Sequence, residues 1–326
     1  MLTRRRMIEL SAASTFAAGL AVRARAQTSA WPNRSVRLIV PLAAGGPTDT
    51  VGRVLADQLS KLWGQQVVIE NKPGGGTNVG NEFVAHSEPD GYTALYGTSS
   101  LATVVGLYHS LAYDPAVDLA PVSLVAKFPF FMFVSNSSPA KSVKEFIADA
   151  KAHPGKRIMG SPGTGSAPYL SEEFFLQMAD IKMTHVPYHG AAPAFIDLIP
   201  GRIDCYFGSG ELLTYSRSGQ VRALATTGAR RSAAEPELPT IAEAGVPGYA
   251  VDSWQGVFLP AKTPPEIINK MSADITTVLA VPAIKEKLAR SAYAAQGSTP
   301  DELRKWLQAD TAKWRAVIKT AGIKID

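Results

Sequence analysis

An α/β fold is the class that this sequence predicts, and three observations predict it. Short apolar runs alternate with stretches of helical periodicity along most of the chain. The 27 glycines and 23 prolines suit many short elements joined by tight turns. A length of 326 residues is enough for one large or two medium domains with their own cores.

The first part of the chain alternates strands and helices. Apolar residues recur at helical spacing from Val51 to Leu62, between two strand-like runs. Such an order implies parallel pairing through crossover connections. We expect strands at 35–40, 66–70 and 92–96, and helices at 48–63 and 78–86.

A second series of alternating strands and helices follows residues 127–135, where the sequence becomes densely apolar. The dense apolar run Phe128-Pro129-Phe130-Phe131-Met132-Phe133-Val134 suits a crossover into a second core. After Trp254 comes a strand-like run at 256–260, then mainly helices, which could pack back onto the first domain. For this series we expect helices at 143–151, 169–179 and 191–199, and strands at 157–160, 182–186, 203–207 and 222–226.

Residues 1–26 predict an export signal. Arg4-Arg5-Arg6 precedes an apolar stretch from Met7 to Val22, and Ala24-Arg25-Ala26 offers small residues for cleavage. The start resembles a twin-arginine signal, with an ordinary secretory signal as the alternative. No segment reaches the roughly 20 apolar residues of a membrane span.

Charge excludes nucleic acid as a partner. Five of the 33 basic residues and one of the 28 acidic residues lie in 1–26, so the remainder carries a net charge of only +1. A nucleic-acid-binding domain needs a basic surface.

The sequence favours neither a metal nor a cofactor. The five histidines show no metal-ligand spacing, and Pro187 prevents His185 and His189 from aligning on a helix. Cys205, the only cysteine, lies in an apolar run typical of a buried strand. The glycine loops at 163–168 and 75–80 match neither the dinucleotide fingerprint nor the P-loop.

Two small-residue loops remain as candidates for binding. Residues 43–49 and 161–166 each follow a strand and precede a helix. Backbone N–H groups at a helix start bind anions with the help of the helix dipole, and glycine lets a ligand approach the backbone. Ordinary βα turns are the other interpretation, but one such loop in each candidate domain favours a clamp at a domain interface.

A series of short motifs resembles the Bug/TctC family, the periplasmic receptors of tripartite tricarboxylate transporters and their relatives. The motifs run in order along the chain: Pro41-Leu42-Ala43-Ala44-Gly45-Gly46-Pro47-Thr48-Asp49, Glu70-Asn71-Lys72-Pro73-Gly74-Gly75-Gly76, Pro89-Asp90-Gly91-Tyr92-Thr93, Tyr113-Asp114-Pro115, His185-Val186-Pro187-Tyr188-His189-Gly190 and Pro239-Thr240-Ile241-Ala242-Glu243-Ala244-Gly245.

The resemblance implies a type II periplasmic binding protein fold, in which two α/β lobes with two chain crossings close on a ligand. We expect lobe 1 at 27–127 plus 255–326 and lobe 2 at 128–254. The ligand contacts implied by the motifs are Ala44, Gly45, Asp49, Thr98, Ser99, Ser161, Gly165, Ser166, Tyr188 and Asp204. For Asp204 a purely structural role is the alternative, because a carboxylate repels a carboxylate ligand.

Two positions depart from the family pattern. Tyr169 stands in a region where many relatives have histidine, and His189 stands where lysine or arginine is usual. Both changes reduce fixed positive charge, which leads to the hypothesis of an aromatic or monocarboxylate ligand in preference to citrate.

The predicted function is therefore that of a periplasmic solute-binding protein without enzyme activity. It would capture a small carboxylate, without a cofactor, and deliver it as a monomer to membrane transporter subunits. Two alternatives stay open: a sensor that presents ligand to a two-component kinase, and an exported hydrolase or isomerase using Asp49, His189 or Cys205.

Overall fold

The computed structural model describes residues 31–323, of which those from Ser35 onward belong to one compact unit. The predicted export signal at 1–26 lies outside the described residues. Among the described residues, no single helix has both the length and the apolar composition of a membrane span. Only helices 265–280 and 282–289, which are bent relative to each other, meet these two criteria when they are counted together.

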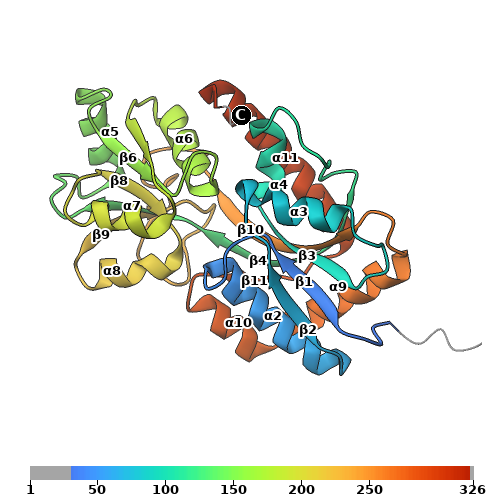
Figure 1. The fold of residues 1–326 in the computed structure, drawn as a ribbon. Coiled ribbons are helices and arrows are strands. Elements are labelled where there is room, and N and C mark those ends of the chain that lie inside the picture. The colour runs from blue at the N-terminus through green and yellow to red at the C-terminus, as the bar shows by residue number, and fades with distance from the viewer. Residues whose placement is uncertain (1–30, 324–326) are drawn as a thin grey trace, which may run out of the picture. The chain divides into compact units, whose positions relative to one another are not determined.

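The chain forms two α/β lobes, each built on its own sheet (Figure 1). The first sheet has the strand order β11-β4-β10-β3-β1-β2. Its three parallel strands β1, β2 and β3 alternate with helices, as the sequence predicts, while β10 runs antiparallel to both β3 and β4. The strands are β1 (Val36–Val40), β2 (Val67–Asn71), β3 (Thr93–Thr98), β4 (Leu119–Pro129), β10 (Asp252–Pro260) and β11 (Ala294–Ala295).

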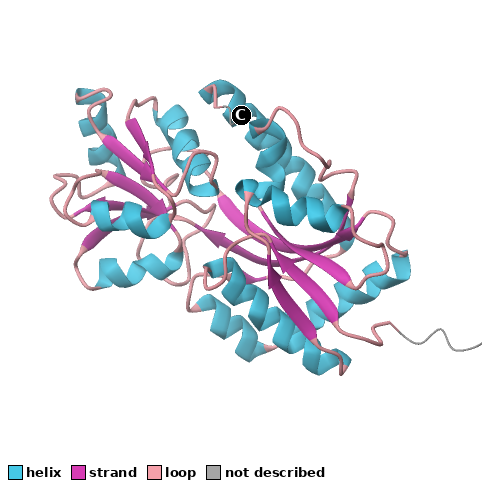
Figure 2. Ribbon diagram, in the orientation of Figure 1, coloured by secondary structure: helices cyan, strands magenta, loops and turns pink. Residues whose placement is uncertain are grey.

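Helices cover both faces of this sheet, as Figure 2 shows. In Figure 1, α3, α4 and α11 lie on one face, and α2, α9 and α10 lie on the other. Their bounds are α2 (Pro47–Trp63), η1 (Gly75–Thr77), α3 (Asn78–Ala85), α4 (Ser100–Leu107), α9 (Pro265–Ala280), α10 (Pro282–Ala289) and α11 (Pro300–Ala321).

The second sheet has the strand order β7-β6-β8-β5-β9. Strands β6, β7 and β8 are parallel, and β5 runs antiparallel to β8 and β9. The elements are β5 (Phe131–Ser135), α5 (Val143–Ala152), β6 (Ile158–Ser161), α6 (Ala167–Ala179), β7 (Thr184–Pro187), α7 (Ala191–Leu198), β8 (Cys205–Gly208), η2 (Gly210–Leu212), α8 (Leu213–Arg217) and β9 (Val221–Thr226).

Two chain segments connect the sheets. The first is the step from β4 to β5 at Phe130, inside the apolar run that predicts a crossover, and the second leads from β9 to β10. The C-terminal helix α11 packs on α4 and β4 and also reaches α6 of the other lobe, where Gln177 Nε2 donates to the Val317 carbonyl at 3.1 Å. The residue limits predicted for the lobes stay a prediction.

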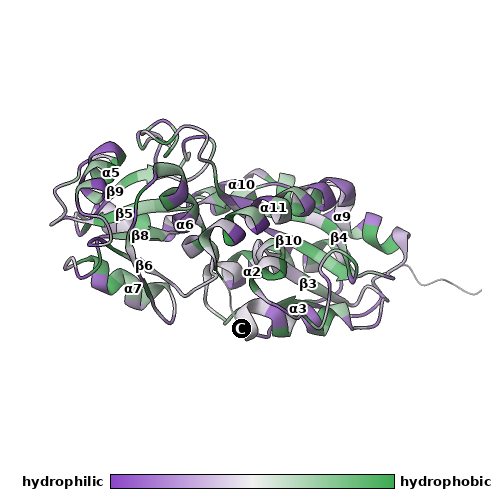
Figure 3. Ribbon diagram, turned by 90° about the horizontal axis from the view of Figure 1, so that it is seen from above, coloured by the Kyte–Doolittle hydropathy of each residue, from purple (hydrophilic) through white to green (hydrophobic). Residues whose placement is uncertain are grey.

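The cores of both lobes are apolar and tightly enclosed. Figure 3 shows β4, β5 and β10 largely in the green of apolar residues, whereas α5 and α11 also carry polar purple. Phe131, Phe133 and Tyr206 form the centre of the second core, and Trp254 is fully buried in the first. Burial of this kind is the main favourable contribution to folding.

Helix α4 and strand β4 are among the elements that the sequence does not predict. Helix α4 is buried on most of its surface, and all eleven residues of β4 are buried or nearly so. An element surrounded by protein lacks the polar positions that create a helical or alternating pattern. Periodicity therefore could not reveal either of them.

Candidate ligand-binding site

A cavity of about 560 Å³ lies between loops of the two lobes. Its polar lining comes from both sheets, and it contains no lysine or arginine. The polar and small residues are Thr48, Gly76, Thr77, Thr98, Ser99, Ser100, Thr103, Gly163, Thr164, Gly165, Ser166, Gly190, Ser209, Ser253 and Gln255.

Helix N-termini gather at this cavity. Strands β1, β2 and β3 of the first sheet lead into α2, α3 and α4, and strands β6 and β7 of the second lead into α6 and α7. Because these strands are parallel within each sheet, their carboxyl ends share one edge, where ligands of open α/β sheets bind. The first residues of all five helices, or those just before them, line the cavity, so its positive potential comes from backbone dipoles.

The 43–49 loop is held by the side chain of Asp49. The Asp49 carboxylate accepts from Gly45 N at 2.9 Å, Arg53 Nε at 2.8 Å and Asn71 Nδ2 at 3.0 Å. The hydrogen bond from Arg53 lowers the pKa of Asp49 from 3.8 to about 2. Because its lone pairs are used inside the loop, Asp49 orders the backbone and does not line the cavity.

Glycine is required at the turn that this carboxylate holds. Gly45 has a φ of +82°, where other residues are strained. Ala44 and Gly45 also do not line the cavity; this part of the chain contributes Thr48 and, just before the loop, Leu42.

The 161–166 loop is held by neutral groups. Ser161 Oγ lies 2.7 Å from His185 Nε2 and accepts from Gly163 N at 3.2 Å. Ser166 caps α6 by accepting from Tyr169 N. Hydrogen bonds among the described residues leave the N–H groups of Thr164 and Gly165 unused, so both are available to a ligand anion.

Thr98 and Ser99 line the cavity where β3 ends. Thr98 Oγ1 lies 2.8 Å from Ser100 Oγ, and Ser99 Oγ lies 2.9 Å from Ser253 Oγ on the antiparallel strand β10. The two hydroxyl pairs are separate, and all four of their residues line the cavity.

Tyr188 and Asp204 do not line the cavity. Tyr188 donates its hydroxyl proton to Asp197 at 2.9 Å. Asp204 precedes β8, where it accepts from Ile158 N at 2.7 Å and pairs with Arg157. Ile158 begins β6, so Asp204 lies at the amino edge of the sheet, about 10 Å from the loop that follows Ser161. This placement favours the structural role.

Aromatic and aliphatic residues form an apolar wall that sequence analysis did not assign to the site. Phe128 and Phe130 belong to the segment between the sheets, which the sequence marks only as a crossover. Helix α4, which contributes two further wall residues, is not predicted at all. The wall consists of Val104, Leu107, Tyr108, Phe128, Phe130 and Tyr293.

The two positions that depart from the family pattern lie elsewhere. Tyr169 is buried against His185, with ring centroids 4.2 Å apart, and His189 is exposed. Neither lines the cavity. The two departures therefore add no aromatic surface to this cavity, whose aromatic lining comes from the apolar wall, and the preference for an aromatic ligand stays a prediction.

The residues considered for an exported enzyme are not assembled. Asp49 is engaged in its loop, His189 is exposed, and Cys205 is buried in β8, where burial raises the pKa of its thiol. Among residues 31–323, no group of three or more His, Cys, Asp or Glu side chains is placed to hold a metal ion.

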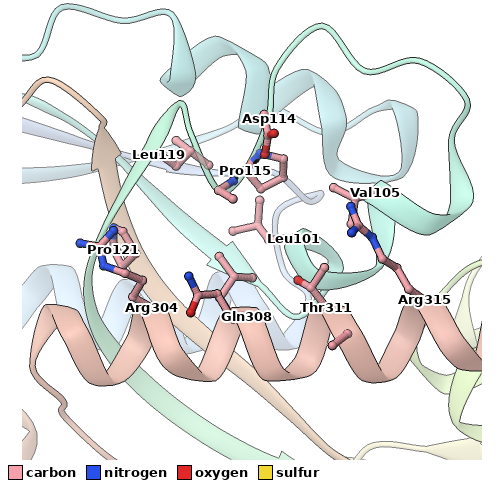
Figure 4. A pocket seen from close by; sticks show the side chains of 13 residues that line it. Leu101, Val105, Asp114, Pro115, Leu119, Pro121, Arg304, Gln308, Thr311 and Arg315 are labelled. Carbon is pink, nitrogen blue, oxygen red and sulfur yellow. Dashed lines mark hydrogen bonds between the residues drawn. The ribbon is translucent and has the colours of Figure 1, made fainter.

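A separate hollow of about 300 Å³ lies between α4, α11 and the chain that leads into β4 (Figure 4). Leu101 and Leu119 lie along it, and Arg304 and Arg315 extend from α11. None of the ten predicted contact residues lines this hollow.

Two lobes joined by two chain segments, with a cavity between loops at the carboxyl ends of their strands, define a solute-binding protein of the type II periplasmic fold. The family model described as the tripartite tricarboxylate transporter family receptor, TctC, matches residues 51–323. The chain therefore belongs to the TctC receptor family.

Curated relatives agree with this assignment. Protein BugT of Bordetella pertussis is 34% identical over 316 residues, which cover 94% of this chain and 95% of BugT. A UPF0065 protein from the tcbD-tcbE intergenic region of a Pseudomonas strain is 33% identical over 294 residues, 89% of this chain and 87% of that protein.

Solved structures are similar over nearly the whole chain. The R. palustris protein Rpa4515 with adipate has 36% identity and a TM-score of 0.83, covering 90% of this chain and 100% of that one. The periplasmic binding protein BugD has 30% identity and a TM-score of 0.80, with the same coverage. MatC from Rhodopseudomonas palustris with bound malate has 31% identity and a TM-score of 0.78, covering 88% and 100%.

Proposed function

We propose that this protein is a periplasmic receptor that captures a carboxylate with an apolar or aromatic body and delivers it to a tripartite transporter. The observation that carries the proposal is the composition of the cavity. Helix N-termini of both lobes meet there without any lysine or arginine, opposite a wall of aromatic and aliphatic side chains.

The helix N-termini suit one carboxylate. Each helix N-terminus stabilises a nearby anion only modestly, through its backbone N–H groups and the helix dipole. A tricarboxylate such as citrate would carry further charges with no cation in the lining to balance them, and removing such charges from water is costly. The structures of relatives with adipate and malate support small carboxylates as the ligand class.

The contacts we propose combine the predicted and the newly found residues. Thr98, Ser99, Gly165 and Ser166 line the cavity directly and would meet the carboxylate. Ala44, Gly45, Asp49 and Ser161 would act by shaping the two loops.

Isothermal titration calorimetry of the purified protein tests the proposal. Benzoate and 3-phenylpropanoate should bind in the micromolar range or tighter, and citrate should bind at least tenfold more weakly. Tight citrate binding without any response to the two aromatic acids would overturn it. Recovery of each ligand unchanged after long incubation would separate a receptor from an enzyme.

A further inference from the structure

Two buried polar atoms without a hydrogen-bond partner belong to residues that line the same hollow beside the cavity. They are Tyr293 Oη and Glu211 Oε2. Tyr293 is only 3% exposed and lines both the main cavity and an adjoining hollow of about 340 Å³, which Glu211 also lines. Buried polar atoms are nearly always paired in proteins, so this pair indicates a group that binds there.

The backbone holds the two residues together. Glu211 follows β8 in the second lobe, and Tyr293 follows α10. Between them, Gly210 approaches Ala292 so closely that a Cβ on Gly210 would lie 2.6 Å from the Ala292 Cβ. The Tyr293 ring packs on Phe128 with centroids 4.6 Å apart, which fixes the phenol in the cavity wall.

Ser209 connects Glu211 to the cavity. Ser209 lines the cavity, and its hydroxyl donates its proton to Glu211 Oε1 at 2.7 Å. A hydroxyl whose proton is committed in this way offers only lone pairs to a ligand. Burial, together with the Glu211 charge, raises the pKa of Tyr293, so the phenol stays neutral.

The charge of Glu211 is not balanced by an ion pair among the described residues. Lys287 lines the adjoining hollow but is exposed to solvent, where its charge is screened. A carboxylate behind Ser209 attracts a donor and repels a second carboxylate.

We propose that Ser209, Tyr293 and Glu211 form a subsite for a hydrogen-bond donor, a hydroxyl or an ammonium group, on the ligand whose carboxylate meets the helix N-termini. The inference rests on the proposed function. It adds that this receptor prefers donor-bearing monocarboxylates and discriminates against a second carboxylate at this position.

Calorimetry with matched probes tests the subsite. The parent probe is 3-phenylpropanoate, and its 3- and 4-hydroxy, 4-aminomethyl and 4-carboxy ring derivatives are compared with it. At least one donor derivative should bind roughly tenfold tighter than the parent, as one good hydrogen bond to a buried acceptor allows. The 4-carboxy derivative should bind more weakly than the parent. A preference for the hydroxy or for the aminomethyl derivatives identifies the kind of donor.

Three variants locate the effect. Glu211→Gln, Tyr293→Phe and Ser209→Ala should each reduce severalfold the ratio by which the donor derivative binds more tightly than the parent. Glu211→Gln should also reduce the ratio by which the 4-carboxy derivative binds more weakly than the parent. Glu237→Gln and Tyr215→Phe, at exposed positions of the second lobe, are the matched controls and should leave both ratios unchanged. Each ratio compares the affinities of two ligands for the same variant. A general loss of binding-competent protein lowers both affinities equally and therefore does not change the ratio.

The outcomes separate the two proposals. If 3-phenylpropanoate binds but no donor derivative binds more tightly, the subsite is wrong and the proposed function stands. The same holds if the affinity ratios of derivative to parent are unchanged in the three variants. If neither the parent nor any derivative binds, both are wrong.

Discussion

The two helices that follow the glycine loops each carry a buried acid, and the environments of the two acids are opposite. Asp49 is the third residue of α2 and accepts hydrogen bonds from Arg53, Asn71 and Gly45, which lower its pKa to about 2. Glu172 is the sixth residue of α6 and is fully buried, and burial raises its pKa well above 4.5. One loop is therefore ordered by a charged acid, whereas burial in the other lobe favours the protonated form of its acid.

Glu172 has a positioning role in the second lobe. Its Oε1 accepts from Phe207 N at 2.7 Å, near the end of β8. That bond ties α6, whose N-terminus lines the cavity, to the strand that leads to Ser209. The same order of strand, loop and helix is thus supported by a charged acid in one lobe and, in the other, by a buried acid whose neutral form is favoured.

The largest expected effect comes from breaking the charged arrangement. Asp49→Asn should lower the free energy of unfolding by about 2–4 kcal/mol, because the donors around the carboxylate lose its charge and one of its two acceptor oxygens. Urea denaturation at pH 7 measures the change. The stability that Asp49 contributes is present above pH 3.8 and is lost as the pH falls toward 2, so the variant should also show a weaker pH dependence in this range.

Asp57→Asn is the matched control on the same helix. Asp57 and Lys61 repeat the i,i+4 pairing of Asp49 and Arg53, but both side chains are more than half exposed. Little change is expected, since exposed ion pairs contribute little. An equal loss in the two variants would refute the distinction between the loop carboxylate and a surface ion pair.

The second effect concerns Glu172, whose contribution to stability depends on pH in the opposite direction to that of Asp49. A raised pKa in the folded state means that the contribution of Glu172 is present below pH 4.5 and is lost as the pH rises. Glu172→Gln keeps an acceptor for Phe207 N and removes the ionisation. Between pH 4.5 and pH 8, the free energy of unfolding of the variant should rise by about 1–3 kcal/mol relative to that of the wild type. This is the range of costs for burying an unpaired polar group. Urea denaturation at several pH values measures the difference. Parallel stability curves for the two proteins would contradict this expectation.

The smallest effect concerns the neutral contacts of the 161–166 loop. Ser161→Ala removes the acceptor of Gly163 N and the partner of His185 Nε2. We expect a loss of about 1 kcal/mol in stability and a severalfold weaker affinity for 3-phenylpropanoate, measured by denaturation and calorimetry. The exposed Ser218→Ala should change neither, and an affinity loss of equal size there would remove the link between Ser161 and the site.

The site was predictable where local chemistry places it and not where distant segments build it. Gly165 and Ser166 are recognisable because a strand, a glycine loop and a capping residue follow one another in the chain. Asp204 is adjacent in sequence to a buried strand, but whether it faces the ligand depends on which end of that strand meets the cavity. The apolar wall combines α4, the segment at 128–130 and Tyr293, which no local pattern connects.

The sequence by itself determined the α/β class, most of the elements, the two loops and the family, because these depend on periodicity, turn chemistry and motif order within short segments. Only the tertiary structure decided that five helix N-termini share one cavity, that Asp49 accepts hydrogen bonds inside its loop, and that Ser209, Glu211 and Tyr293 line the cavity or the hollow beside it. The reason is physical: a local pattern records which face of an element is buried, whereas the partners of that face are set by the pairing of strands far apart in the chain.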